Sequence, residues 1–278
     1  MKKNQIRTWL ALGAAIALTG CQQPKNNDEI TVETTTAVRH LNDSTGTYEI
    51  RIDFPVVKNG EALSVALNEW IDEQLGGTYG DAENVDYDKV LADTTALIDY
   101  YSKKIFEGNQ KEFAEMSKGS PEVKEMGITY YDSLVIEKFA EGKNWITYTN
   151  KRDIYLGGAH GAAPYFGQTF RKSDGRRIGW DVFTETSGEK FQQILKEGLV
   201  EYFGVSSVAE LADHLMNEAG IHYIPLPQCP PLFTAEGVSF VYNQYEIAAY
   251  AAGLPSFTVG YDKLQPFMMT AGKRLVVE

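Results

Sequence analysis

Apolar residues recur in this sequence with two periods, and the order of those periods constrains the fold more than any other feature. From Thr47 to Val56 apolar and polar residues alternate, which predicts a half-buried strand. From Glu61 to Gly77 the apolar residues follow helical spacing, and the same spacing predicts a second helix from Val90 to Ile105, with Asp86 or Asp88 accepting from its first amides. After Pro121 the alternating pattern returns.

The second half of the chain predicts two hairpins and two more helices. Residues 130–139 and 145–150 flank a turn, and residues 165–172 and 176–180 flank Asp174-Gly175, a dipeptide that favours primed turns. Thr186 with Glu189, and Ser207 with Glu210, resemble capping boxes ahead of helices. Residues 233–242 and 257–261 are typical of closing strands.

Strand runs broken by helix pairs, without regular βαβ alternation, favour an α+β fold with a mainly antiparallel sheet packed with helices. We expect two sub-domains, a smaller α/β companion domain over residues 46–122 and a C-terminal domain over residues 123–278. A chain of this length can bury an adequate hydrophobic core either as one large domain or as two small ones.

The N-terminus predicts a lipoprotein. A basic start and a short apolar run end in Leu18-Thr19-Gly20-Cys21, which resembles the bacterial lipobox. We therefore expect a signal peptide over residues 1–20, a lipid anchor on Cys21 that holds the protein to a membrane, and a tether over residues 21–45 with one short strand between Ile30 and Val38. The expected location is the cell envelope, facing the periplasm or the cell surface. Gln22 after the cysteine favours the outer membrane over the inner.

Charge narrows the range of partners. The signal peptide holds three of the 26 Lys and Arg residues, so 23 remain against 38 Asp and Glu, a formal net charge of −15. Nucleic acid is not an expected partner, because phosphate binding needs clustered basic residues. The acidic surface favours solubility and would also attract a cationic protein. With Cys21 acylated, Cys229 is the one remaining cysteine, so we expect no internal disulfide.

A glycine-rich segment around His160, one of four histidines, is the most distinctive local motif. Glycines permit positive φ and close approach of the backbone, which predicts a sharp turn. Three of them flank this histidine: Gly157, Gly158 and Gly161. A structural turn histidine bonded to neighbouring backbone is the favoured interpretation. In the second interpretation, His160 contacts a ligand together with Tyr155 and Tyr165. In the third, His160 is a general base or a metal ligand.

The usual catalytic and metal-binding patterns are missing from the sequence. The other histidines are scattered, no His-Glu-x-x-His is present, and no Gly-x-Ser-x-Gly occurs, so we expect no metal, no cofactor and no assigned catalytic residue. Asp181 and Glu246 could form a carboxylate pair. Structural roles are favoured for both: Asp181 at a strand-to-helix junction, and Glu246 bonded to buried backbone or to a tyrosine hydroxyl. Tyr242, Tyr245 and Tyr250 could form a binding platform, although core packing is the commoner use of tyrosine.

Three motifs in order carry a family resemblance: YLGGAHG, then WDVF after the Phe170–Gly175 hairpin, then VYNQYEIAAYAAGLPSFTVGYDKL. Together they resemble the RsiV-like domain family, also called domain of unknown function 3298, over roughly Asp153 to Met268. Residues 45–120 resemble the smaller domain that often precedes it. The resemblance implies an extracytoplasmic domain of the kind found in anti-sigma factors, where RsiV is a lysozyme receptor, and beside peptidoglycan deacetylase domains. Sigma-factor binding is not expected here.

Two functional hypotheses follow. The first is an envelope-anchored, non-catalytic lipoprotein that binds a lysozyme-like protein or a peptidoglycan or other glycan fragment. Its candidate contact residues are Tyr155, His160, Tyr165, Tyr245 and Glu246. The alternative is a cell-wall-active hydrolase or deacetylase with a site near His160 and Asp181.

Overall fold

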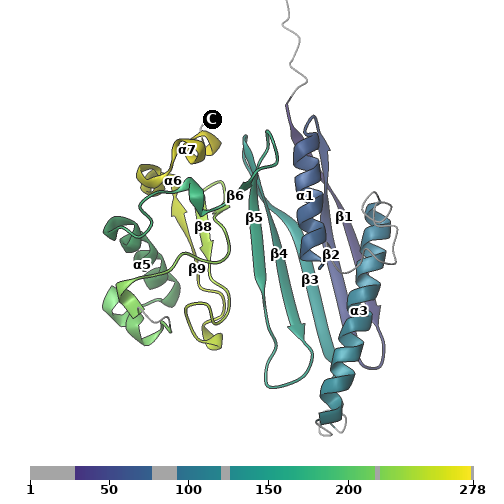
Figure 1. Ribbon diagram of the computed structural model, residues 1–278. Coiled ribbons are helices and arrows are strands. Elements are labelled where there is room, and N and C mark those ends of the chain that lie inside the picture. Colours follow the sequence, from purple (N-terminus) through teal and green to yellow (C-terminus); the bar gives the residue numbers. More distant parts are fainter. Residues whose placement is uncertain (1–28, 77–92, 120–125, 217–219, 277–278) are drawn as a thin grey trace, which may run out of the picture.

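The computed structural model describes residues 29–76, 93–119, 126–216 and 220–276, which form two sheets and the helices that cover them (Figure 1). Six strands make one sheet in chain order: β1 (Thr31–Asn42), β2 (Gly46–Lys58), β3 (Tyr130–Glu141), β4 (Trp145–Tyr155), β5 (Tyr165–Arg171) and β6 (Arg177–Ile178). A second sheet contains β7 (Leu232–Phe233), β8 (Gly237–Val241) and β9 (Ser256–Gly260). Among these strands only β2 and β3 pair in parallel. The predicted α+β class with mainly antiparallel pairing is confirmed.

Five α-helices and five short 3₁₀ segments complete the described chain. The α-helices are α1 (Glu61–Gln74), α3 (Thr94–Gly119), α5 (Glu189–Phe203), α6 (Tyr261–Leu264) and α7 (Thr270–Val276). The 3₁₀ segments are η1 (Trp180–Val182), η2 (Val208–Asp213), η3 (Gly220–His222), η4 (Tyr250–Ala252) and η5 (Gln265–Phe267). None of these helices has the length and hydropathy needed to cross a bilayer.

The first hydrophobic core lies between the six-stranded sheet and helices α1 and α3. Alternate residues of β2 point to this core, because successive strand side chains face opposite ways. Ile50 and Ile52 are fully buried there against Leu63 and Leu67 of α1. Each fully buried aliphatic side chain contributes about 1.5–3 kcal/mol through removal of apolar surface from water.

The second core lies on the opposite face of β4 and β5, beneath the three-stranded sheet and α5. Buried threonines join the two parts: Thr147 Oγ1 donates to the Phe233 carbonyl at 2.8 Å, and Thr169 Oγ1 accepts from the Phe233 amide at 3.0 Å. Gly167 is required nearby, since a Cβ there would lie 2.6 Å from the Leu232 side chain. Strand β7 is therefore fixed directly to the larger sheet.

The predicted division at residue 122 falls inside the six-stranded sheet. Strand β2 precedes that point and β3 follows it, yet the two pair from Gly46↔Tyr130 to Ile52↔Ile136 and share one core. The second core is built mainly from residues after β5. The packing thus changes around residue 172 rather than at residue 122.

The short strand predicted within the tether is present but longer than expected, because residues 31–42 all belong to the edge strand β1. All twelve pair antiparallel with β2, from Thr31↔Lys58 to Asn42↔Thr47. The segment buries only Val32 fully, so its hydrophobic pattern is weak, but its threonines and valines favour extended backbone. Residues 1–28, which contain the predicted signal peptide and Cys21, lie outside the described residues.

Two other local predictions need correction. Helix α5 begins at the backbone of Gly188 without a side-chain cap, so Thr186 and Glu189 do not form a capping box. Ser207 Oγ does donate to Glu210 at 3.0 Å, but this pair begins the 3₁₀ segment η2 rather than an α-helix. The predicted strand 233–242 is interrupted by a turn in which Thr234 Oγ1 accepts from the Gly237 amide at 3.2 Å.

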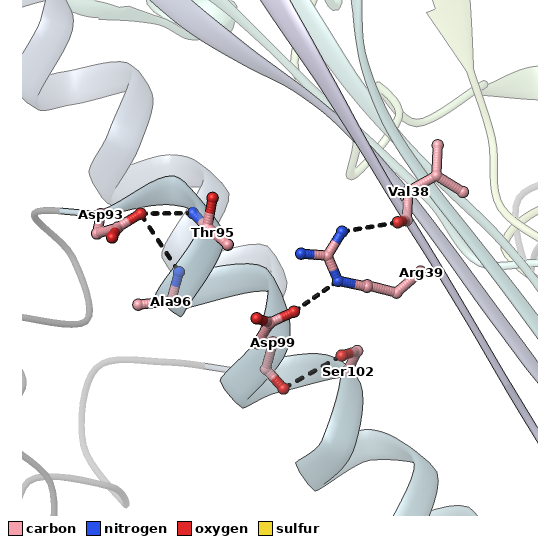
Figure 2. A network of polar contacts seen from close by, with 7 residues as sticks. All are labelled: Val38, Arg39, Asp93, Thr95, Ala96, Asp99 and Ser102. Carbon is pink, nitrogen blue, oxygen red and sulfur yellow. Dashed lines mark hydrogen bonds and ion pairs between the residues drawn. The ribbon is translucent and has the colours of Figure 1, made fainter.

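Helix α3 begins at Thr94, later than predicted, and Asp93 caps it. The Asp93 carboxylate accepts from the amides of Thr95 and Ala96 at 2.8 and 3.4 Å, as Figure 2 shows. One turn further on, Asp99 accepts from Arg39 Nε of β1 at 2.5 Å, so the same end of the helix is tied to the edge strand. The residues predicted to cap the helix, Asp86 and Asp88, lie outside the described residues.

We expect Asp93→Ala to lower the free energy of unfolding by about 1 kcal/mol, because two amides at the start of α3 lose their acceptor. Urea unfolding followed by circular dichroism measures this. The matched control is Asp99→Ala, which removes an exposed ion pair and is expected to cost less. An equal or larger loss for Asp99→Ala would contradict the capping role.

Candidate functional site

The six-stranded sheet has two ends, and the predicted site residues divide between them. At the entry end the chain enters β1 at Thr31, which pairs with Lys58, and the preceding residues 29–30 line one groove with residues 171–173. At the far end Tyr131 pairs with Tyr155, and residues 156–164 connect β4 to β5. Figure 1 shows this connection at the lower edge of the sheet, opposite the point where the chain enters β1.

The far-end loop has the backbone geometry for which glycine is needed. Gly157 and Gly158 have φ of 103° and 89°, in the region that disfavours other residues. A Cβ on Gly161 would lie 2.7 Å from the Ile154 carbonyl oxygen. That close approach allows Ile154 and Ala162 to exchange backbone hydrogen bonds of 2.9 and 2.8 Å. The glycines therefore close the loop tightly around His160.

His160 is exposed but held in place on both sides of its ring. Its Nδ1 lies 2.8 Å from the Gly161 carbonyl oxygen, which can only accept, so Nδ1 is the donor. The Tyr245 hydroxyl lies 3.4 Å from Nε2. The imidazole also stacks on Tyr250, with ring centroids 4.1 Å apart and planes inclined by 28°. The predicted bond to neighbouring backbone is present, together with aromatic partners that the sequence did not indicate.

Five rings gather at this end of the sheet, and we call them the distal aromatic cluster: Tyr131, Tyr155, His160, Tyr245 and Tyr250. Tyr131 and Tyr155 stack at 6.0 Å, and the Tyr155 hydroxyl donates to the Gly158 carbonyl at 3.1 Å. Tyr245 and Tyr250 lie 5.8 Å apart. Partial burial and the charge of Asp153 raise the pKa of the Tyr131 phenol, and nearby Tyr250 raises it further. Tyr131 and Tyr245 are 43% and 59% exposed, an unusual exposure for large aromatic side chains.

Tyr245 is presented by a strained backbone. Its φ of 65° is left-handed, and among the described residues only Asn59 and Glu185 share this feature without being glycine. Glu246 holds the turn: its carboxylate accepts from the amides of Asn243 and Gln228 at 2.7 and 2.6 Å. Such strain persists only where surrounding contacts over-determine the conformation, and it is concentrated at functional sites.

Two side chains fasten the Tyr245 turn to the glycine loop. Asn243 Oδ1 accepts from the Tyr165 amide at 2.8 Å, and Asn243 Nδ2 donates to the Tyr165 carbonyl at 3.0 Å. Gln244 Oε1 accepts from the Ala163 amide at 2.9 Å. The two sequence motifs, about 80 residues apart, thus form one surface.

Two predicted tyrosines lie outside the cluster. Tyr165 packs against Cys229, Leu232 and Val241, and burial raises the pKa of its phenol. Tyr242 is fully buried and donates to the Pro225 carbonyl at 2.8 Å, so it packs in the core, the use favoured from the sequence, and is not part of a platform with Tyr245 and Tyr250. Tyr131 was missed, although the alternation of β3 points it away from buried Tyr130.

Asp181 lies far from His160. Its carboxylate pairs with Arg176 Nη2 at 2.6 Å, beside the entry end of β5, whereas His160 precedes the far end of that strand. Seven strand residues separate the two ends by about 20 Å. His160 and Asp181 therefore cannot act on the same bond. Glu246 is committed to two backbone amides, which agrees with the structural role favoured from the sequence.

The remaining reactive groups of the described chain offer little chemistry. Burial raises the pKa of the Cys229 thiol to about 12, so this cysteine is a poor nucleophile. Within the described residues no group of three or more His, Cys, Asp or Glu side chains could hold a metal ion. What the far end does offer is a rigid, exposed aromatic surface.

The α+β fold of this protein is similar to that of two solved structures. One is a DUF3298 family member from Bacteroides fragilis, with TM-score 0.63 and 19% identity over 87% of this chain and 94% of that chain. Another is a DUF3298 family protein from Pseudomonas aeruginosa, with TM-score 0.53 and 12% identity over 87% of this chain and 96% of that chain.

The family model described as protein of unknown function DUF3298 matches residues 232–262, which include the Tyr245 turn. The predicted resemblance to this family is thereby confirmed over that segment. No curated protein matches the sequence.

Proposed function

We propose that this protein is an envelope-anchored, non-catalytic lipoprotein whose RsiV-like domain binds a glycan fragment of peptidoglycan at the distal aromatic cluster. The observation that carries the proposal is the exposed, pre-organised set of rings at one end of the sheet. Rings that are already fixed in place lose little conformational entropy when a ligand binds.

The chemistry of the cluster suits a sugar chain. Aromatic faces pack against the apolar C–H faces of pyranose rings, while their polar tips remain available for hydrogen bonds. Tyr131 brings such a tip beside the Asp153 carboxylate, 3.4 Å from its hydroxyl, and carboxylates accept readily from sugar hydroxyls. The Tyr155 and His160 rings extend the same surface.

The position of the cluster fits an anchored protein. Cys21 is eight residues from Glu29, a length of chain that spans at most about 28 Å. The chain joins the sheet at the entry end, so the cluster at the far end points away from the anchored terminus. A receptor for wall material would use this orientation.

A lysozyme-like protein is the second candidate ligand, supported by charge. A formal net charge of −15 after removal of the leader would attract a cationic enzyme and accelerate its encounter with the protein. Binding to a lysozyme would weaken steeply as salt is added, whereas stacking on a neutral glycan would not.

We expect Tyr245→Ala to weaken binding of a purified muropeptide about 10-fold, because it removes the most exposed tyrosine of the cluster. Calorimetry at two salt concentrations, with muropeptides and with lysozyme, measures affinity and separates the two ligands. The matched control is Tyr223→Ala, which removes another exposed tyrosine, 43% accessible. Equal affinity of both variants and the parent would exclude the cluster as the site.

A further inference from the structure

A basic groove lies at the entry end of the sheet, separate from the distal aromatic cluster. Its volume is about 840 Å³, and it runs between the β3–β4 turn, the end of β5 and helix α7. Four of the residues that line it are cationic: Lys143, Arg171, Lys172 and Arg274. In a strongly acidic chain, this concentration of positive charge is an exception.

The groove keeps an excess of positive charge after its internal ion pairs are counted. Arg171 pairs with Asp174, and Lys172 lies 2.5 Å from Glu141. Lys143 and Arg274 have no carboxylate partner among the described residues, and Glu29 is the one acidic residue in the lining. An Arg guanidinium and a Lys ammonium without partners are the groups that bind phosphate best.

The groove also faces the anchored side of the molecule. Glu29 and Ile30 line it, and they are the first described residues after the predicted anchor. The chain from Cys21 to Glu29 reaches at most about 28 Å, so the groove stays near the membrane surface. The two or three acyl chains of a lipobox cysteine hold the protein to the membrane but do not fix its orientation, and a basic patch beside such an anchor adds attraction to anionic headgroups.

We propose that this groove binds the phosphate of anionic lipid headgroups in the membrane that holds the anchor, and so fixes the protein with its entry end against the bilayer. The proposal rests on the lipid anchor of the proposed function. Contact with the headgroups would add to the anchor and keep the distal aromatic cluster pointing outward.

The test uses the full lipidated protein, with acylation of Cys21 verified by mass spectrometry, in phosphatidylcholine vesicles with or without phosphatidylglycerol. We expect phosphatidylglycerol to slow hydrogen exchange at the β3–β4 turn about 5-fold, and Lys143→Glu with Arg274→Glu to remove this protection. The control pair, Lys103→Glu with Lys111→Glu, makes the same charge change on α3 and should leave the protection intact.

Several outcomes would overturn the proposal. Equal exchange in the two kinds of vesicle would do so, as would unchanged protection in the Lys143→Glu, Arg274→Glu variant. Equal protection by inorganic phosphate on neutral vesicles would assign the groove to a free anion instead of a lipid. An unmodified Cys21 would contradict the proposed lipid anchor but not the proposed groove. In that case, sedimentation of the unacylated protein with phosphatidylglycerol vesicles would test the groove.

Discussion

Replacement of Asp132 by alanine is expected to lower the free energy of unfolding by about 2–4 kcal/mol. Asp132 is 2% exposed and accepts from Arg152 Nε at 2.8 Å, from Arg152 Nη2 at 2.5 Å and from Asn109 Nδ2 at 2.7 Å. Without the carboxylate, a largely buried guanidinium and a buried amide lose their partners together. The loss stays below that of a fully enclosed pair, because the Arg152 side chain is 29% exposed.

Urea unfolding followed by tryptophan fluorescence measures this loss. Asp132→Asn keeps the shape but not the charge, so an intermediate loss is expected. The control Asp153→Ala removes an exposed carboxylate from the neighbouring strand and should change stability by less than about 1 kcal/mol. If Asp132→Ala were as stable as Asp153→Ala, the buried pair would have no structural role.

In the second core, Phe191→Ala is expected to cost about 3–5 kcal/mol. Phe191 is fully buried, and its ring centroid lies 6.0 Å from that of Phe183, 6.4 Å from that of Phe240 and 5.2 Å from that of Phe267. Removal of this ring leaves a cavity that three aromatic neighbours cannot easily fill. Thermal and urea unfolding measure the loss, and Phe139→Ala, at a position 45% exposed, is the control expected to stay within about 0.5 kcal/mol of the parent.

The two variants also test whether the two cores unfold together. Phe233 is bonded through Thr147 and Thr169 to the larger sheet and lies 6.0 Å from the Trp145 ring, so we expect one transition in both variants. Distant sites in one cooperative unit have additive effects, and the double variant should lose the sum of both. Two separate unfolding transitions would contradict this expectation. If Phe191→Ala shifted the midpoint of only one of them and Asp132→Ala the midpoint of only the other, the two cores would be independent folding units.

Most of the fold could be predicted where hydrophobic periodicity was strong. The alternation in β2 and the helical spacing of α1 reflect burial on one face, and both elements lie where the sequence placed them. Strand β1 was predicted too short because it is an edge strand with one fully buried residue, so its length depends on pairing with β2 rather than on its own pattern. The capping box predicted for α5 was wrong, because the helix begins at the backbone of Gly188 and no side chain bonds to its first amides.

The candidate site was only partly predictable. The glycines of residues 157–161 predicted the loop around His160, and the family resemblance drew attention to the segment that contains Tyr245. The structure places His160 and Tyr245 side by side. Whether a tyrosine points to the core or to solvent is decided by tertiary packing. The sequence therefore left open whether Tyr242 and Tyr165, both buried, would contact a ligand, and it gave no indication of Tyr131.

The antiparallel pairing of β1 with β2 has a mechanical consequence. If a bilayer holds the chain before Thr31 while a ligand is pulled at the opposite edge of the sheet, β1 is drawn lengthwise past β2. The bonds along the register Thr31↔Lys58 to Asn42↔Thr47 then resist in shear, all at the same time, instead of opening one after another as in a zipper. A force applied through a bound wall fragment would then be transmitted to the lipid anchor along the β1 and β2 strands, the direction in which a pair of strands resists separation best.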